Sequence, residues 1–257
     1  MSYIDSIVLG IIQGLTEFLP ISSSGHLVLT QYWLDIESDD ILLEIVVHLG
    51  TLCSILFYYR FEIKSLLNDI RAKRKSGIDY LLMILVSTLP AIFLGFILKS
   101  KIELLFNPSY VPYMFLLTGL VLLSTKFLSK TVKKSLSIKS AIIIGFFQAF
   151  AMIPGISRSG MTISIALILG INRSEAAKFS FFIAIPILAG AGIIELSSVS
   201  NLEFDFLPLL TSFVLSFVSG YLVISFLIKI ISNDSFWKFS IYCIIVGLLF
   251  IVFGIDN

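Results

Sequence analysis

Six long apolar stretches constrain the fold of this chain more than any other feature. An α-helix needs about 20 consecutive apolar residues to cross the ~30 Å hydrocarbon core of a bilayer. The stretches that meet this requirement cover residues 41–59, 79–98, 110–128, 177–196, 206–231 and 238–254. The chain is also 57% hydrophobic and only 14% charged, which is too apolar for the surface of a soluble domain. The sequence therefore predicts an all-α polytopic membrane protein with six transmembrane helices.

Two further regions are apolar but interrupted. Residues 3–34 and 140–171 each contain two apolar arms separated by a loop rich in Pro, Ser and Gly. At 1.5 Å per residue, each arm is too short to cross the membrane as a helix. Irregular backbone at membrane depth persists only where protein or a water-filled cavity surrounds it. We therefore expect two re-entrant helix-loop-helix hairpins.

The loops of the two predicted hairpins share a motif. The first reads QGLTEFLPISSSGH from residue 13, and the second reads QAFAMIPGISRSGM from residue 148, an offset of 135 residues. Without a gap, the second copy repeats Gln13 as Gln148, Ser22 as Ser157, Ser24 as Ser159 and Gly25 as Gly160. This correspondence suggests that the two loops are halves of one active site.

The repeated motif also predicts how the domain is organised. Residues 1–257 should form a single membrane domain of two repeats: 1–130, with hairpin 3–34 and three spans, and 138–257, with hairpin 140–171 and three spans. Because three crossings is an odd number, the second repeat should be upside down relative to the first. This is an inverted-topology repeat, in which the two hairpins meet near the midplane.

The distribution of charge tests this topology. If segment 60–78 is cytoplasmic, fifteen Lys and Arg residues fall on the cytoplasmic side, and two fall on the opposite side. The fifteen are Arg60, Lys64, Arg71, Lys73, Arg74, Lys75, Lys126, Lys130, Lys133, Lys134, Lys139, Arg173, Lys178, Lys229 and Lys238. The opposite side receives Lys99 and Lys101 together with Asp35, Glu37, Asp39, Asp40, Glu103, Glu203, Asp205 and Asp256.

This asymmetry follows the positive-inside rule. It predicts a multi-pass protein of the plasma membrane with both termini outside, with the first hairpin open to the outside and the second open to the inside. No Lys or Arg precedes Arg60, so the first apolar segment lacks the basic flank of a cleaved signal peptide.

The two loop motifs contain one residue of each charge, Glu17 and Arg158. An ionisable residue at membrane depth predicts a functional site. A buried ion pair that only joins the hairpins would also explain the two charges, but it would leave the repeated serines and glycines unexplained.

The loops also carry the features of an anion site. The second loop should precede a helix that begins near Met161 or Thr162, with Ser159 or Gly160 near its cap. A helix start presents N–H groups and a partial positive charge that favour phosphate or carboxylate, and Arg158 adds a planar donor fork. The residues predicted to bind phosphate are Arg158, Ser22, Ser24, Gly25, Ser157, Ser159 and Gly160.

The first loop adds reactive side chains. His26 can attack phosphorus or donate a proton to a leaving oxygen. Glu17 can act as a base, orient the imidazole, or bind a hard cation through oxygen. Ser23 could be a nucleophile with His26 as its base, or a cap beside a helix start. Met161 replaces His26 in the second copy. We therefore expect the first hairpin to supply the reactive groups and the second to bind the anion.

Other polar residues in the apolar segments allow two interpretations. Glu44 and His48 lie one helical turn apart on one face, and could support the site or form a buried hydrogen-bonded couple. Gln13 and Gln148 lie in the arms of the hairpins, where Gln148 is expected to make a structural contact.

The motifs at residues 13–26 and 154–160 resemble those of the undecaprenyl-diphosphate phosphatase family (UppP, also called BacA). The length and the pattern of segments fit that family from end to end. The resemblance implies removal of the terminal phosphate from a polyprenyl diphosphate, with a divalent cation, Mg²⁺ or Ca²⁺. It also implies recycling of the lipid carrier for envelope glycan synthesis, an active site on the extracytoplasmic side, and bacitracin resistance on overproduction.

The same resemblance implies catalytic roles for Glu17, Ser23, His26 and Arg158. The family commonly has Glu where this chain has Gln13, so a role for Gln13 beside Glu17 as a metal ligand depends on its amide oxygen.

A membrane phosphatase is thus the leading hypothesis, and a secondary transporter or flippase for an anionic substrate is the alternative, because transporters also use inverted repeats with broken helices. The sequence leaves open the nucleophile, the metal, the length of the isoprenoid and whether the protein is a homodimer.

Overall fold

The computed structural model describes residues 3–36, 41–129, 134–197 and 205–253, and within these ranges the chain is helical, without named strands. Four helices form two pairs: α1 (Tyr3–Phe18) with α2 (Ser23–Trp33), and α7 (Ile138–Phe150) with α8 (Arg158–Ile168). The longer helices are α3 (Ile41–Tyr58), α5 (Lys75–Glu103), α6 (Val111–Leu128), α9 (Arg173–Leu196), α10 (Phe206–Ser232) and α11 (Phe239–Phe253). A short helix α4 (Arg60–Arg71) follows α3, and a 3₁₀ turn η1 (Phe236–Lys238) precedes α11.

The long apolar stretches form helices where the sequence predicts them. Within the described ranges, five segments are long and apolar enough to cross a membrane: α5, α6, α9, α10 and η1 with α11. Helix α3 together with α4 would make a sixth. Pro90 and Pro186 lie inside α5 and α9, which continue through them. The all-helical membrane architecture is therefore confirmed.

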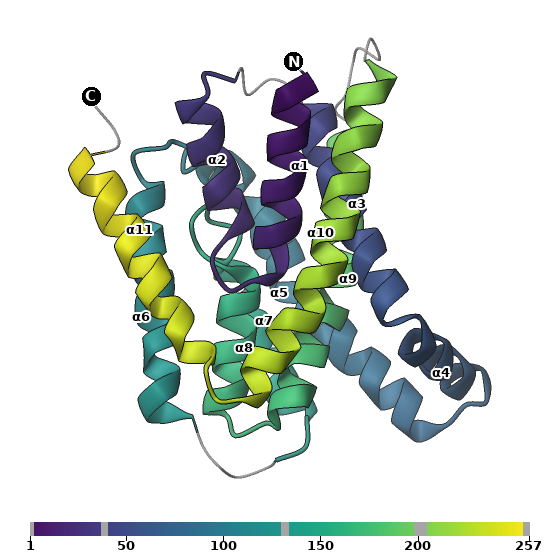
Figure 1. Cartoon of the computed structure of the whole chain (residues 1–257). Helices are drawn as coiled ribbons and strands as arrows, with labels where there is room; N and C mark the ends of the chain where they lie inside the picture. Colours follow the sequence, from purple (N-terminus) through teal and green to yellow (C-terminus); the bar gives the residue numbers. More distant parts are fainter. Residues whose placement is uncertain (1–2, 37–40, 130–133, 198–204, 254–257) are drawn as a thin grey trace.

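The two predicted hairpin regions contain pairs of short helices. Their four helices have 16, 11, 13 and 11 residues, so at 1.5 Å per residue none reaches ~30 Å. In Figure 1 the α1–α2 pair extends downward and the α7–α8 pair extends upward, so that their loops face each other inside the helical body.

Each pair packs against a long helix through small residues. Helix α1 lies along α10, and α7 lies along α5. At Gly10 in α1 an added Cβ would lie 2.8 Å from the Ser212 carbonyl oxygen, and a Cβ on Gly145 in α7 would overlap the Ser87 backbone in the same way. Such close backbone approach requires small residues in membrane helix pairs.

Helix α4 differs from the prediction, which treats segment 60–78 as a loop. The chain bends by 71° between α3 and α4, and none of the side chains of α4 is buried. The signal is present in the sequence, because Ile63, Leu66, Leu67 and Ile70 follow the spacing of an amphipathic helix. Its charged residues obscure this spacing in a search for apolar spans.

Contacts between loops bring most of the basic segments to one end of the molecule. The Arg173 guanidinium pairs with Asp234 at 2.5 Å, which joins the start of α9 to the end of α10. The Lys126 ammonium lies 4.4 Å from the ring centre of Trp237, which joins the end of α6 to η1. Predicted topology residues outside the described ranges are Glu37, Asp39, Asp40, Lys130, Lys133, Glu203 and Asp256, and the side chains of Lys99 and Glu103 are likewise not described.

Candidate active site

The loop between α1 and α2 meets the loop between α7 and α8 in the interior. Three hydrogen bonds join them: Arg158 Nη2 to Glu17 Oε1 at 2.7 Å, Gly155 N to Ser22 Oγ at 3.1 Å, and Ser159 Oγ to the Leu19 carbonyl at 3.0 Å. The loops also approach at their glycines, since a Cβ on Gly25 would lie 2.9 Å from the Gly155 Cα. The two loops are therefore in direct contact, as a site built from both would require.

Ser22 and Ser157 hold equivalent positions as the N-caps of α2 and α8. Each hydroxyl accepts a hydrogen bond from the glycine N–H three residues later, at 3.3 Å from Gly25 and 3.0 Å from Gly160. The next serines repeat as well, with the hydroxyls of Ser22 and Ser24, and of Ser157 and Ser159, each 3.3 Å apart. The predicted pair of matching helix starts is present.

Helix α8 begins earlier than predicted. The expected start near Met161 or Thr162 is wrong, because α8 begins at Arg158. The Ser157 hydroxyl bonds the Gly160 N–H, so Gly160 already belongs to the first turn instead of the loop. As a result, Arg158 is the first residue of the helix, where backbone N–H groups have no partner within the helix.

Glu17, in the last turn of α1, lies at the centre of the polar contacts. Its Oε1 accepts from Arg158, and its Oε2 accepts from Ser23 Oγ at 2.6 Å and from Gln13 Nε2 at 3.1 Å. The Glu17 and Arg158 side chains are 6% and 12% exposed. The two loop charges thus form a buried ion pair, and a serine hydroxyl lies directly against its carboxylate.

Three residues outside the predicted site hold Arg158 and the second loop in place. The Arg158 Nη1 donates to the Ser180 carbonyl on α9 at 3.3 Å, and the Ser180 hydroxyl lies 2.7 Å from the Thr162 hydroxyl. Thr118 on α6 donates to the Gly155 carbonyl and accepts from the Ser157 N–H. In the sequence, these residues can be recognised only as polar residues within apolar segments. That feature does not identify a site residue, because many such side chains bond only to the backbone of their own helix.

His26 lies in the first turn of α2, and its two ring nitrogens have partners outside the ion pair. Its Nδ1 is 2.7 Å from the Ser22 carbonyl, and its Nε2 is 2.7 Å from the hydroxyl of Tyr242 on α11. The ring of Phe115 packs edge-on against the imidazole, with ring centres 5.0 Å apart. The structure thus joins Ser23 to Glu17 instead of His26, and it joins His26 to Tyr242, which the sequence reading missed.

Glu44 and His48 do not bond to each other through their side chains. His48 Nδ1 lies 2.7 Å from the Glu44 carbonyl, one turn earlier in α3, while Gln31 Nε2 donates to Glu44 Oε1 at 3.4 Å. Helix α3, which carries both residues, packs against α1, the helix of Glu17. This geometry favours a supporting position beside the site over a closed hydrogen-bonded couple.

The two glutamines of the motif have different surroundings. Gln148 donates to the Ser87 carbonyl on α5 at 3.1 Å, the structural contact that the sequence predicts. Gln13 instead donates to Glu17 and so belongs to the site. Both side chains are buried, and the amide oxygen of each lacks a hydrogen-bond partner.

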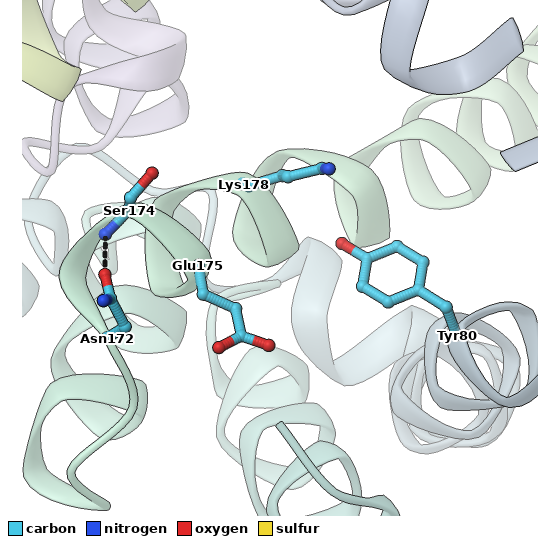
Figure 2. Close-up of a pocket in the computed structure, with 5 residues that line it drawn as sticks. All are labelled: Tyr80, Asn172, Ser174, Glu175 and Lys178. Atoms are coloured by element: carbon cyan, nitrogen blue, oxygen red, sulfur yellow. Dashed lines mark hydrogen bonds between the residues drawn. The ribbon is translucent and has the colours of Figure 1, made fainter. Parts of the chain in front are cut away.

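A polar pocket of about 380 Å³ lies away from this site (Figure 2). It is lined by Tyr80 on α5 and by residues at the start of α9, namely Asn172, Ser174, Glu175 and Lys178. None of these residues belongs to the two loops, and Asn172 and Glu175 already bond the backbone N–H groups of Ser174 and Leu136. The pocket is therefore built from residues outside the two loop motifs.

Comparison with known proteins supports the interpretation of the motifs. Residues 6–249 match the family model described as bacitracin resistance protein BacA. Similar proteins include the undecaprenyl-diphosphatases of Buchnera aphidicola subsp. Acyrthosiphon pisum strain 5A (39% identity, 96% of each chain) and Christiangramia forsetii (38% identity, 99% of each chain). That of Methanobrevibacter smithii is 37% identical over 97% of this chain and 96% of its own.

The match to the family model extends through both loops and nearly all of the helices described above. This chain therefore belongs to the bacitracin resistance protein BacA family.

Proposed function

We propose that this protein is an undecaprenyl-diphosphatase of the membrane, which removes the terminal phosphate of the lipid diphosphate and returns the monophosphate carrier to envelope glycan synthesis. The observation that supports this most directly is the cluster of Arg158, Glu17 and Ser23 between two helix starts. Relatives that share more than a third of the sequence are named for this activity. Those names do not favour the transporter or flippase alternative.

The second loop provides the phosphate-binding half of the site. A guanidinium has five N–H donors, and the contacts to Glu17 and Ser180 involve one on each terminal nitrogen. The remaining donors can bind phosphate oxygens while the ion pair persists. The starts of α2 and α8, with the serine and glycine residues that cap them, add N–H groups and partial positive charge.

The first loop provides the reactive half, with Ser23 as the proposed nucleophile. Its hydroxyl is 2.6 Å from Glu17 Oε2, so the carboxylate can take the proton as the oxygen attacks the terminal phosphorus. The new bond joins Oγ to phosphorus as the bridging oxygen leaves with the polyprenyl monophosphate. Both nitrogens of His26 are engaged by other groups, which makes the imidazole a poorer candidate for the attack.

A second displacement completes the hydrolysis. Water attacks the phosphorus of the phosphoserine, the bond from phosphorus to Ser23 Oγ breaks, and Ser23 recovers a proton from protonated Glu17. The products are inorganic phosphate and the free enzyme. We assign Nε2 of His26, once Tyr242 is displaced, to taking a proton from the attacking water and passing it to the departing phosphate, because Nδ1 is bonded to the Ser22 carbonyl.

The expected divalent cation has two candidate oxygen donors in the chain. The amide oxygen of Gln13 is buried without a hydrogen-bond partner, and the nitrogen of the same amide donates to the Glu17 carboxylate. In the part of the chain that the structure describes, no group of three or more His, Cys, Asp or Glu side chains could hold a metal. A cation that shares the diphosphate oxygens needs only one or two protein carboxylates, so Glu17 and Gln13 fit this arrangement. When bound, the cation would neutralise charge on the diphosphate.

An inverted-topology repeat explains the arrangement of helices. Under the 135-residue offset α1 corresponds to α7, and in order along the repeats α5 corresponds to α10. In the structure α1 packs with α10, and α7 packs with α5. Replacing each helix of one pair by its counterpart in the other repeat gives the other pair. Together with the basic end near α4, this supports a plasma membrane protein with six spans and two re-entrant hairpins. Its termini and the opening of the first hairpin would then be extracytoplasmic.

The test is phosphate release from undecaprenyl diphosphate by the purified protein in detergent. We expect Arg158→Lys to lower kcat/KM by roughly a hundredfold or more, because the variant keeps the charge beside Glu17 but loses the planar donor fork. His26→Ala should also lower the rate strongly. Wild-type rates from both variants would contradict the assignment, and transport of substrate across liposomes without phosphate release would favour the alternative.

A further inference from the structure

Tyr242 touches the candidate site from a helix that carries no part of either motif. Its hydroxyl is 2.7 Å from His26 Nε2. The two rings are stacked, with centres 5.8 Å apart and planes inclined by 14°. The phenol and the imidazole therefore meet through both a hydrogen bond and a face contact, which restricts the position and tilt of the imidazole.

The hydrogen bonds of His26 determine which nitrogen carries the proton. The Ser22 carbonyl oxygen, 2.7 Å from Nδ1, can only accept, so Nδ1 must donate and must be protonated. In the neutral imidazole Nε2 is then an acceptor, and its partner has to donate. The Tyr242 hydroxyl supplies that donor. Together, Ser22 and Tyr242 select one of the two tautomers.

The position of Tyr242 allows it to move away. Its side chain is 42% exposed, so packing does not enclose it on all sides. His26, in contrast, is fixed at Nδ1 and by the edge of Phe115. Ser23 and His26 lie three residues apart on one face of α2, so a protonated phosphate oxygen held beside Ser23 can replace the phenol as the donor to Nε2.

We propose that Tyr242 is a positioning residue for His26 in the phosphatase reaction. Its hydroxyl holds the imidazole with the proton on Nδ1 and with Nε2 directed out of α2. When the substrate binds, a protonated oxygen of the diphosphate takes the place of the phenol as the donor to Nε2. The kinetic consequence rests on the proposed function, whereas the selection of the tautomer rests only on the contacts of His26.

The selection of the tautomer can be tested without any activity measurement. The chain has two histidines, so ¹⁵N NMR of histidine-labelled protein should show two sets of imidazole resonances. The set that is missing in the His26→Gln variant belongs to His26. At a pH where the ring is neutral, we expect protonated Nδ1 and unprotonated Nε2 in the wild type. Tyr242→Phe should shift the Nε2 resonance, because its donor is removed. An Nε2–H tautomer in the wild type, or an unmoved Nε2 resonance in the variant, would overturn the proposal.

The kinetic test compares two identical chemical changes. Tyr242→Phe keeps the stacked ring but removes the hydroxyl, and we expect kcat to fall about tenfold with KM changed less than about twofold. Tyr113→Phe, at a 55% exposed position on α6, should leave both parameters unchanged. A Tyr242→Phe enzyme with wild-type kcat, or one whose loss of rate is matched by loss of thermal stability, would reduce Tyr242 to a structural role.

If the wild-type protein released no phosphate, the proposed function would fail. The NMR measurement would still decide whether Tyr242 and Ser22 select the tautomer of His26, so the two failures can be distinguished.

Discussion

At the scale of single residues, the informative contact is between Ser23 and Glu17. A carboxylate that accepts from a serine hydroxyl at 2.6 Å, and from an arginine on its other oxygen at 2.7 Å, is oriented by both partners. A buried ion pair alone would need only the arginine. The serine therefore favours the catalytic interpretation of Glu17 over a purely structural one, and it moves the expected base for Ser23 from His26 to Glu17.

Replacing Ser23 tests this directly. Ser23→Ala should lower kcat by roughly a thousandfold or more, because it removes the atom that attacks phosphorus, and no phosphoenzyme should form. Mass spectrometry of protein quenched during turnover should find the phosphoryl group on Ser23 in the wild type. The matched control is Ser232→Ala, which removes an exposed hydroxyl at the end of α10 that bonds the Ile228 carbonyl. Substantial activity in Ser23→Ala would transfer the role to water or to His26.

At the scale of elements, the site depends on how closely the α7–α8 loop approaches α6. Gly155 has φ +91°, and a Cβ there would lie 2.6 Å from Met114 Cβ and 2.7 Å from the Val111 carbonyl oxygen. Its N–H also bonds Ser22 in the other loop. A side chain at this position would therefore force the two loops apart.

Gly155→Ala should destabilise the protein by about 2–4 kcal/mol, because backbone strain and overlap with α6 add together. Gly190→Ala is the control, since a Cβ on Gly190, within α9, meets nothing within 4 Å. That change should be neutral or stabilise the protein by up to about 1 kcal/mol. Thermal unfolding in detergent measures both, and equal effects of the two variants would contradict the packing argument.

At the scale of the whole molecule, contacts among loops join the basic segments at one end. In Figure 1 this end lies opposite the start of α1, and α4 belongs to it. Two contacts join segments that are distant in sequence. They are the ion pair of Arg173 with Asp234 and the cation–π contact of Lys126 with Trp237. In the proposed topology, which follows the positive-inside rule, this end faces the cytoplasm.

Labelling of introduced cysteines tests this assignment. In a background without Cys53 and Cys243, a membrane-impermeant maleimide should label the Ser109→Cys variant in intact cells, because Ser109 lies in the exposed connection before α6. The Ser65→Cys variant, at an exposed position on α4, should react only after the membrane is permeabilised. Reaction of Ser65→Cys in intact cells would reverse the topology.

Much of this architecture follows from the sequence because its causes are local or repeated. Apolar runs of the length of a bilayer predict the spanning helices without knowledge of their neighbours. The copied serines and glycines predict that each loop ends in a serine cap, and Ser22 and Ser157 both accept from the glycine N–H three residues later, although only Ser22 has a positive φ. The sequence predicts too late a start for α8. The reason is that a single hydrogen bond, from the Gly160 N–H to the Ser157 hydroxyl, determines that Gly160 belongs to the helix and not to the loop.

The all-helical membrane class follows from the sequence alone, and the repeated motif indicates which two loops to compare. Which side chains are partners was decided only by the tertiary structure. Ser23 and His26 are near neighbours in α2, yet Ser23 bonds to Glu17 and His26 bonds to Tyr242, 216 residues away. The physical reason is that hydrogen bonds depend on distance and direction between atoms, and the packing of α1 and α11 around α2 sets both.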